Sequence, residues 1–260
     1  RTKLSVIKNF IKSSMNRYLR KSFIDHNLLK EVPKNSSYVY FPMAVDMERN
    51  LLITAPYYTN QIETIRHIVK SLPVNYQLYV KENPNAASRD WHSIDEYKEI
   101  MKIPNVKLIH PSTDVETIYQ NSSLVIATAG SSPFEAAAYG KPSIIFSDQI
   151  YDILPSVFKV ENIKDLPELI RKALQTKVNT NDLDSYIHLL EKNTFDFDIL
   201  GFSAMFKDRF YHGGSLSDVT ISEELLQEFL EEQKDALEKF TLEHIKRINW
   251  YKLTSSKNKR

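Results

Sequence analysis

Cysteine and glycine are scarce in this sequence, which has no cysteine and only five glycines among its 260 residues. The absence of cysteine excludes disulfide bonds and thiolate chemistry, and it is typical of proteins that stay in a reducing compartment. No apolar run approaches the roughly 18 residues needed to span a bilayer, and no signal peptide is visible. The formal net charge is only +1, so the chain as a whole has no strong attraction to nucleic acid. We therefore expect a cytoplasmic protein that does not bind nucleic acid.

The first 35 residues form a basic segment, in which apolar residues at helical spacing predict a helix over residues 1–32. A basic amphipathic helix of this kind can rest on an anionic lipid surface. It can equally pack on a neighbouring domain and leave its basic face in solvent, and both alternatives stay open. The apolar residues are Leu4, Ile7, Ile11, Met15, Tyr18 and Leu19.

Between residues 36 and 178, short apolar segments alternate with helical patterns. Strands separated by helices require right-handed crossovers, which give a parallel sheet with helices on both faces. This region therefore predicts an α/β domain with a Rossmann-like, doubly wound sheet. The expected strands are 38–41, 77–81, 106–109, 124–128, 143–146 and 158–160, and the expected helices are 60–72, 94–101, 115–120, one that follows Ser132, and 166–174.

The alternation stops in the last region, residues 179–260, which we expect to be helical with one irregular break, FKDRFYHGGSLSD. A long amphipathic stripe runs through its final part and needs a partner surface, either on this domain or on another. The stripe comprises Leu226, Phe229, Leu230, Leu237, Phe240 and Ile248.

The stretch TAGSSPFEAAAYGKP joins the fourth predicted strand to the next helix. Ligands of open parallel sheets bind beyond the carboxyl ends of the strands, so this junction is a candidate site. Gly130 allows a tight turn, and Ser131 and Ser132 supply hydroxyl groups and can cap the helix. Free amides at a helix start bind phosphate, and Glu135 one turn later can accept from ribose hydroxyls. An ordinary strand–helix turn explains the same residues equally well.

The loop after the second predicted strand, KENPN, is a second candidate. Asn83 can donate its amide to a phosphate or sugar oxygen, and Pro84 fixes the loop. Lys81 ends the strand and can supply a positive charge. A plain turn with a solvated lysine is the alternative.

Other strand ends give weaker indications. Phe41, Glu48 and Arg49 belong to the segment at the end of the first strand, and Pro111 follows the third strand, where it can line a base pocket. The seven histidines show no spacing typical of metal ligands, so we predict no metal site. No acidic pair stands out, and the catalytic residues stay unassigned.

Taken in order, these stretches resemble the capsule and surface-polysaccharide biosynthesis family of bacteria and archaea. Members of that family are similar to GT-B glycosyltransferases, including those that transfer 3-deoxy-octulosonic acid from its CMP-activated form. The resemblance covers residues 37–176. It is carried by YVYFPMAVDMER, NQIETIRHIVKSLPVNYQLYVKENP, IPNVKLIHPSTD, LVIATAGSSPFEAAAYGKPSIIF and YDILPSVFKVENIKDLPELIRKAL.

The resemblance implies site residues. Ser131, Ser132 and Glu135 stand where the family holds the phosphate and ribose of a nucleotide. Pro84 keeps its place, but Asn83 replaces a histidine that meets the donor phosphate in the family. Asparagine can still donate a hydrogen bond there, although it carries no charge.

The resemblance also implies a function, namely the donor-binding half of a glycosyltransferase of surface or capsular polysaccharide. The donor would be a nucleotide-activated sugar, with a CMP-sugar favoured, and neither a cofactor nor a metal is implied. The acceptor would be a glycan or a lipid-linked glycan, which allows a place at the inner face of the cell membrane. In the family the acceptor site and the catalytic carboxylate belong to another, N-terminal domain, which we expect to be missing or reduced to the helix of residues 1–32.

Two alternatives stay open. A nucleotide-sugar epimerase of the UDP-N-acetylglucosamine 2-epimerase type shares this architecture, and it would favour UDP over CMP. A degenerate domain that binds a nucleotide or a partner protein without catalysis also fits, because Asn83 departs from the family pattern.

Overall fold

The computed structural model describes residues 3–34, 37–46, 48–84, 86, 92–214 and 218–257, and it describes no side chains for residues 3–6 and 254–257. The chain divides into two compact units, Arg1–Ile187 and His188–Arg260, which are treated separately below. In the described part of the chain, no helix has both the length and the apolar character that crossing a bilayer requires.

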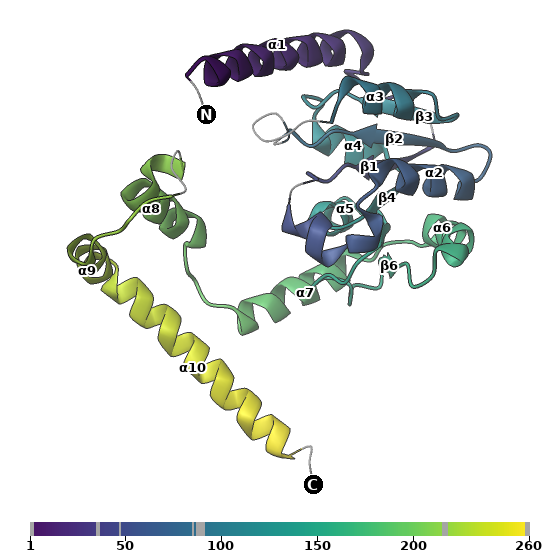
Figure 1. The fold of residues 1–260 in the computed structure, drawn as a ribbon. Coiled ribbons are helices and arrows are strands. Elements are labelled where there is room, and N and C mark those ends of the chain that lie inside the picture. Colours follow the sequence, from purple (N-terminus) through teal and green to yellow (C-terminus); the bar gives the residue numbers. More distant parts are fainter. Residues whose placement is uncertain are drawn as a thin grey trace. The chain divides into compact units, whose positions relative to one another are not determined.

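The first unit is built on a six-stranded, all-parallel sheet with the strand order β3-β2-β1-β4-β5-β6 (Figure 1). This is the order of a doubly wound Rossmann-like sheet, so the predicted fold class is confirmed. The order reverses between β1 and β4, which are neighbours in the sheet. The strands are β1 (Tyr38–Pro42), β2 (Gln77–Lys81), β3 (Val106–Ile109), β4 (Leu124–Ala127), β5 (Ser143–Ile145) and β6 (Val157–Lys159).

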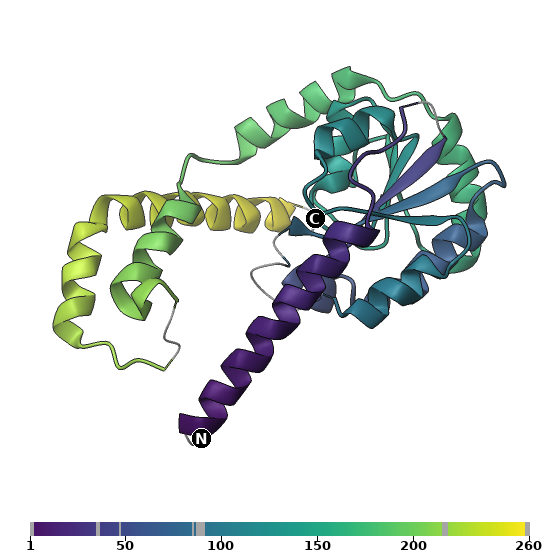
Figure 2. The ribbon, with the colours of Figure 1, turned by 90° about the horizontal axis from the view of Figure 1, so that it is seen from above.

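Helices cover both faces of this sheet (Figure 2). Successive side chains of a strand point to opposite faces, so Val39 and Phe41 pack with α2, α3 and α6, whereas Tyr38 and Tyr40 pack with α4 and α5. Both faces are therefore buried, as the continuous apolar strands require. The helices of this unit are α1 (Lys3–Asn27), α2 (Gln61–Ser71), α3 (Ile94–Met101), α4 (Val115–Asn121), α5 (Ser132–Ala138), α6 (Leu166–Gln175) and the first part of α7 (Thr180–Asn193).

Polar residues fix the starts of three of these helices. The side chains of Asn60 and Asp114 accept hydrogen bonds from backbone amides in the first turns of α2 and α4. Ser93 and Glu96 form a reciprocal capping box at the start of α3. Such caps contribute about 1 kcal/mol each, so short helices begin at defined residues.

The first helix is shorter than predicted, because α1 ends at Asn27 rather than at residue 32. The segment that follows runs along the edge of the sheet and forms backbone hydrogen bonds with β3. The amide of Leu29 donates to the carbonyl of Leu108, and the amide of His110 donates to the carbonyl of Leu29. This pairing ends the helix, because the backbone groups of Leu29 bind β3 instead of the preceding turn.

The loop after β1 also contains helical turns that the sequence analysis did not predict. A π-helical turn covers Asn50–Thr54, and a 3-10 turn covers Pro56–Tyr58. Leu51 is fully buried, so this loop is packed against the domain.

The second unit contains the end of α7 together with α8 (Ile199–Tyr211), α9 (Glu223–Glu232) and α10 (Lys234–Lys257). Its core is aromatic, with the Phe229 ring in contact with the rings of Phe202, Phe206 and Phe210. Among the residues of the predicted stripe, Phe229 is buried. Leu226, Leu230, Phe240 and Ile248 stay at least 37% exposed.

The predicted break in this region is wrong at its start, because α8 runs on to Tyr211. The apolar spacing of Phe206 and Phe210 supports helix there, and the chain leaves the helix only at His212, which has a left-handed backbone. The end of the predicted break, residues 215–217, lies outside the described residues. A second break, which the sequence analysis missed, separates α7 from α8 at residues 194–198.

Candidate functional site

A cavity of about 360 Å³ lies at the carboxyl ends of β1, β2 and β3, beside the first turn of α5. We call it the strand-end cavity. It adjoins both β1 and the helix that follows β4, and ligands of doubly wound sheets bind where the strand order reverses in this way. Its lining residues are Tyr40, Pro42, Met43, Lys81, Glu82, Asn83, Pro84, Pro111, Thr113, Val115, Tyr119, Ser132 and Glu135.

Lys81 is the notable member of this lining, because its side chain is buried rather than solvated. The residue is 5% exposed, and its Nζ donates to the backbone carbonyl of Thr113 at 2.7 Å. Among the described residues it forms no salt bridge. Burial lowers the pKa of Lys81, and the charge of Asp114 acts in the opposite direction. An ammonium group has three donors, so Lys81 can donate to an anion in the cavity while it keeps Thr113.

Glu135 is held in place by two hydroxyl groups. Ser131 Oγ donates to Glu135 Oε1 at 2.6 Å, and the Tyr119 hydroxyl donates to Glu135 Oε2 at 3.0 Å. Burial raises the pKa of Tyr119, so its phenol stays protonated and can act as this donor. A carboxylate oxygen accepts more than one hydrogen bond, so Glu135 can still receive a ribose hydroxyl.

The turn before α5 has the geometry that the sequence predicted, but not the predicted cap. Gly130 has a φ of +98°, which favours glycine. The side chain of Ser131 does not cap α5, because its hydroxyl donates to Glu135 instead. Within the described part of the chain, the amides of Ser131 and Ser132 have no hydrogen-bond partner. These two donors are therefore available to a ligand.

The structure brings most of the predicted residues to one place. The strand-end cavity is lined by Lys81, Asn83, Pro84, Pro111, Ser132 and Glu135. Gly130 and Ser131 directly precede Ser132 but do not line the cavity.

Three further predicted residues do not reach this lining. Phe41 is fully buried in the core against α2, because its side chain points to the opposite face of the sheet from Tyr40. Glu48 and Arg49 lie further along the loop after β1. The sequence analysis also did not name Tyr40, Thr113 and Tyr119 as residues of the site, although they line the cavity. Their positions near strand ends or on an inward helix face were the sequence features that could have indicated them.

A largely buried polar network adjoins the cavity through Glu82, and the sequence analysis did not predict it. We call it the Glu82 network, and it comprises Asp46, Gln61, Glu82, His92 and Tyr97. Glu82 Oε2 accepts from His92 Nδ1 at 2.7 Å and from the Tyr97 hydroxyl at 2.6 Å. Glu82 Oε1 accepts from the backbone amide of Asn83 at 2.9 Å.

The imidazole of His92 lies between two carboxylates. Its Nδ1 faces Glu82, and its Nε2 lies 3.3 Å from Asp46 Oδ2. Burial by itself lowers the pKa of His92, but hydrogen bonds and charges of Asp46 and Glu82 outweigh it and raise the pKa to about 10. His92 is therefore an imidazolium at neutral pH, and both of its N–H groups donate.

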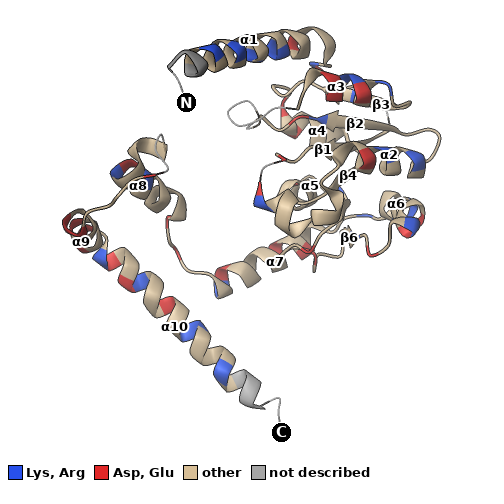
Figure 3. Ribbon diagram, viewed as in Figure 1, with Lys and Arg blue, Asp and Glu red and all other residues tan. Residues whose placement is uncertain are grey.

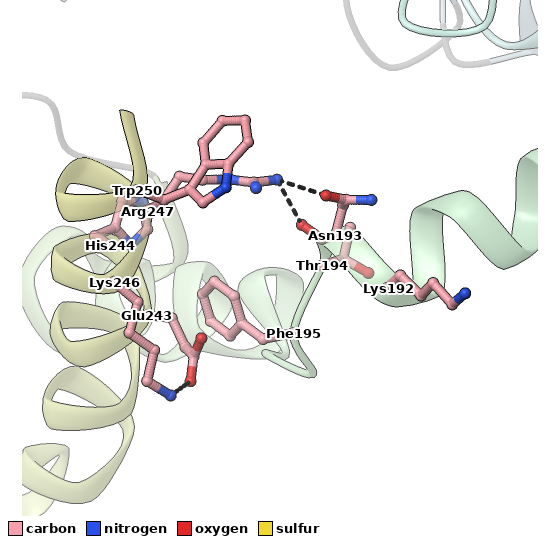
Figure 4. A pocket seen from close by; sticks show the side chains of 9 residues that line it. All are labelled: Lys192, Asn193, Thr194, Phe195, Glu243, His244, Lys246, Arg247 and Trp250. Atoms are coloured by element: carbon pink, nitrogen blue, oxygen red, sulfur yellow. Dashed lines mark hydrogen bonds and ion pairs between the residues drawn. The ribbon is translucent and has the colours of Figure 1, made fainter. Parts of the chain in front are cut away.

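A larger hollow, of about 460 Å³, lies in the second unit between the end of α7 and α10 (Figure 4). Arg247 donates there to the backbone carbonyl and the side chain of Asn193, and it stacks over Trp250. Lys246 binds Glu243. Arg247 and Lys246 therefore already bind protein groups of the same hollow.

No protein-family model matches this sequence, and no curated protein sequence matches it either. Solved structures do resemble it in fold. KpsC, a beta Kdo 2,7 transferase from Thermosulfurimonas dismutans, is 17% identical, with 55% of this chain and 47% of that chain covered and a TM-score of 0.41. UDP-GlcNAc 2-epimerase from Methanocaldococcus jannaschii is 15% identical, with 72% and 52% covered and a TM-score of 0.43.

A third similar structure is the spinosyn rhamnosyltransferase SpnG complexed with thymidine diphosphate. It is 12% identical, with 62% of this chain and 41% of that chain covered and a TM-score of 0.37. The chain thus spans about half the length of the solved structures that it resembles. At these identities the likeness concerns the fold alone.

Proposed function

We propose that this chain is the donor-binding part of a glycosyltransferase that uses a nucleotide-activated sugar. The observation that carries the proposal is the ammonium group of Lys81, which is buried in a cavity at the strand-order reversal and forms no salt bridge among the described residues. Burial of this cation is costly, and the charge of Asp114 offsets the cost only in part, because the pKa of Lys81 is still lowered. An anionic ligand in contact with the ammonium group would reduce the cost further. The phosphate of a nucleotide is the anion that such a sheet edge receives.

The lining groups suit one phosphate and its ribose. Lys81 supplies charge, while Asn83 and Ser132 supply neutral donors. Charge-assisted hydrogen bonds contribute about 1.5–3 kcal/mol each, so two or three of them hold a phosphate. We expect Glu135, which Ser131 and Tyr119 hold in position, to accept from the ribose hydroxyls. A single phosphate fits this compact site, so we favour a CMP-linked acidic sugar over a sugar diphosphate.

The same groups would assist departure of the nucleotide. When the bond between the sugar carbon and the phosphate oxygen breaks, the electron pair stays on that oxygen. Donors that already point at the phosphate stabilise this growing charge without having to reorganise. The acceptor hydroxyl must lose its proton to a base, and we assign that role to no residue of this chain. The acceptor would be a glycan or a lipid-linked glycan of surface or capsular polysaccharide.

Calorimetric titration of the protein with CMP, UDP and GDP tests this proposal. We expect CMP to bind most tightly, and the full-length protein to transfer sugar from a CMP-linked donor to an acceptor. Tighter binding of UDP, with release of an epimerised sugar nucleotide and no acceptor, would support the epimerase alternative instead. Binding without transfer would support a non-catalytic domain, and no binding of any of the three would reject the site.

Replacing Ser131 and Ser132 together with alanine is expected to weaken CMP binding at least about tenfold. The change removes the Ser132 hydroxyl from the lining and releases Glu135 from Ser131, so at least one hydrogen bond to a charged group is lost. The measurement is the dissociation constant by calorimetry. Ser185→Ala on α7 is the matched control and should bind like the parent, whereas an unchanged affinity in the double variant would remove the turn from the site.

We also propose that α1 rests on an anionic membrane surface. Ile7, Ile11, Met15 and Tyr18 share one helical face and are 56–72% exposed. Ile24, which packs on the domain, lies on a different face of the helix. Basic residues flank the apolar face, and the described part of α1 has no acidic residue before Asp25 (Figure 3). The flanking residues are Lys8, Lys12, Arg17 and Lys21.

Lys8→Glu together with Lys12→Glu is expected to lower binding to phosphatidylglycerol vesicles at least about tenfold, because each basic residue near such a surface contributes about 1 kcal/mol. Cosedimentation with the vesicles measures this. The matched control is Lys70→Glu with Lys102→Glu, which makes the same charge change at exposed positions outside α1, in α2 and at the end of α3. Equal losses in both variants, or equal binding to neutral phosphatidylcholine vesicles, would contradict a specific role of α1.

A further inference from the structure

The Glu82 network connects the loops that leave two neighbouring strands. Asp46 belongs to the loop after β1, and Glu82 belongs to the loop after β2. His92 lies between their carboxylates, at 3.3 Å from Asp46 and 2.7 Å from Glu82. Both loops also line the strand-end cavity, through Met43 on one side and Asn83 on the other. The imidazolium of His92 is thus an ionic link between two walls of the cavity.

Gln61 attaches the first of these loops to α2. Its Oε1 accepts from the amide of Ala44 at 2.7 Å, and its Nε2 donates to the carbonyl of Ala44 at 2.9 Å. The same Nε2 donates to Asp46 Oδ1 at 2.7 Å. Gln61 is only 3% exposed. Because α2 packs on the sheet, Gln61 holds the Asp46 carboxylate in position independently of its contact with His92.

Glu82 connects His92 to the cavity, because its carboxylate binds both the imidazole of His92 and the backbone amide of Asn83. Glu82 is 1% exposed, and among the described residues its two oxygens accept from His92, Tyr97 and the amide of Asn83. The backbone from which the Asn83 side chain extends is therefore held in part by the Glu82 carboxylate.

Stability alone does not account for this arrangement. Replacing a buried ion pair by apolar residues of similar volume is often neutral or stabilising, so such groups are weak contributors to net stability. Buried polar groups with fully satisfied partners instead favour one conformation over its alternatives. The side chain of Asp46 is 44% exposed and does not line the strand-end cavity.

We propose that Asp46 and His92 are positioning residues for the strand-end cavity, which act through Glu82 to hold Asn83 toward a bound phosphate. The part of this inference that concerns phosphate binding rests on the proposed nucleotide site. Its structural part, that Asp46 controls the Asn83 amide through His92, is independent of any ligand. The two parts need separate measurements.

Asp46→Asn is the decisive variant, because asparagine keeps an oxygen for Gln61 but loses the charge that faces His92. We expect exchange of the Asn83 amide with solvent to become at least about threefold faster, since the network that orders its acceptor is weakened. With CMP as the probe, we expect about fivefold weaker binding. We also expect a lower melting temperature, because Asp46 helps to raise the pKa of His92 in the folded protein. Asp46→Glu should recover most of the affinity, and Asp148→Asn, in an ion pair on the domain surface, is the control.

The outcomes separate the two proposals. If the parent protein binds no nucleotide, the proposed function fails, and the exchange rate of Asn83 still decides the structural part. Unchanged exchange in Asp46→Asn would overturn the positioning role outright. A lower melting temperature with unchanged CMP affinity would mean that Asp46 stabilises the fold only, and this would also overturn it.

Discussion

Lys81→Met is expected to bind CMP about a hundredfold more weakly than the parent protein. The Lys81 ammonium is buried in the strand-end cavity, where its attraction to a phosphate is screened less than at the surface. Loss of one to two charge-assisted hydrogen bonds of about 1.5–3 kcal/mol each gives this factor. Methionine has a similar length and flexibility, so the shape of the cavity is largely kept. Calorimetric titration measures the change.

The same variant should not be less stable. Because burial lowers the pKa of Lys81 in the folded protein, the charged form is disfavoured by folding, and this cost is present at any pH below the folded pKa. Removal of the charge removes the cost, so unfolding by urea at pH 7 should need at least as much denaturant as the parent. Lys107→Met, at an exposed lysine of β3, is the matched control for affinity. Equal CMP affinity in Lys81→Met and the parent would remove the basis of the proposed function.

His92→Leu is expected to lower the free energy of unfolding by about 3–5 kcal/mol at pH 6. Among the described residues, the donors that remain for the buried Glu82 carboxylate are then Tyr97 and the Asn83 amide, and the charge of His92 is lost. Urea denaturation at several pH values measures the difference. His67→Leu, at an exposed histidine of α2, is the control and should change stability by less than about 0.5 kcal/mol.

The difference between His92→Leu and the parent should depend on pH. The pKa of His92 is raised from 6.5 to about 10 on folding, so its stabilisation is complete below pH 6.5 and is lost as the pH rises through 10. Among the described residues, the groups that face His92 are Asp46 after β1, Gln61 of α2, Glu82 after β2 and Tyr97 of α3. The hollow beside it is lined by Glu63, Arg66, Glu96 and Glu99. A difference that stays constant from pH 6 to pH 10 would contradict the ionic link.

The fold was largely predictable because its signals are local. Each strand is a short apolar run between turn residues, and the bounds of all six predicted strands differ from the observed ones by no more than one residue. The errors arose where longer-range contacts decide the structure. α1 ends early because Leu29 pairs with the backbone of β3, and α8 continues past Phe206 because its aromatic residues pack on Phe229.

The site was predictable only in part. Parallel strands bring their carboxyl ends to one edge, so Lys81, Asn83 and Ser132 could be expected near each other. The burial of Lys81 could not be expected, because a lysine at a strand end is usually solvated and the sequence does not reveal that the carbonyl of Thr113 accepts from its ammonium group. The Glu82 network was equally hidden. Glu82 and His92 are separated by a polar stretch that gives no sign that their side chains meet.

The backbone of Leu29 has a consequence for how this protein behaves in crowded solution. A terminal strand with open amides and carbonyls is a template onto which strands of other molecules can add, and β3 is such a strand. Leu29 already pairs with part of this edge: its carbonyl accepts from the amide of His110, and its amide donates to the carbonyl of Leu108. We therefore expect the segment around Leu29 to hinder the pairing of β3 with strands of other molecules. A chain trimmed beyond residue 29 would lose that protection.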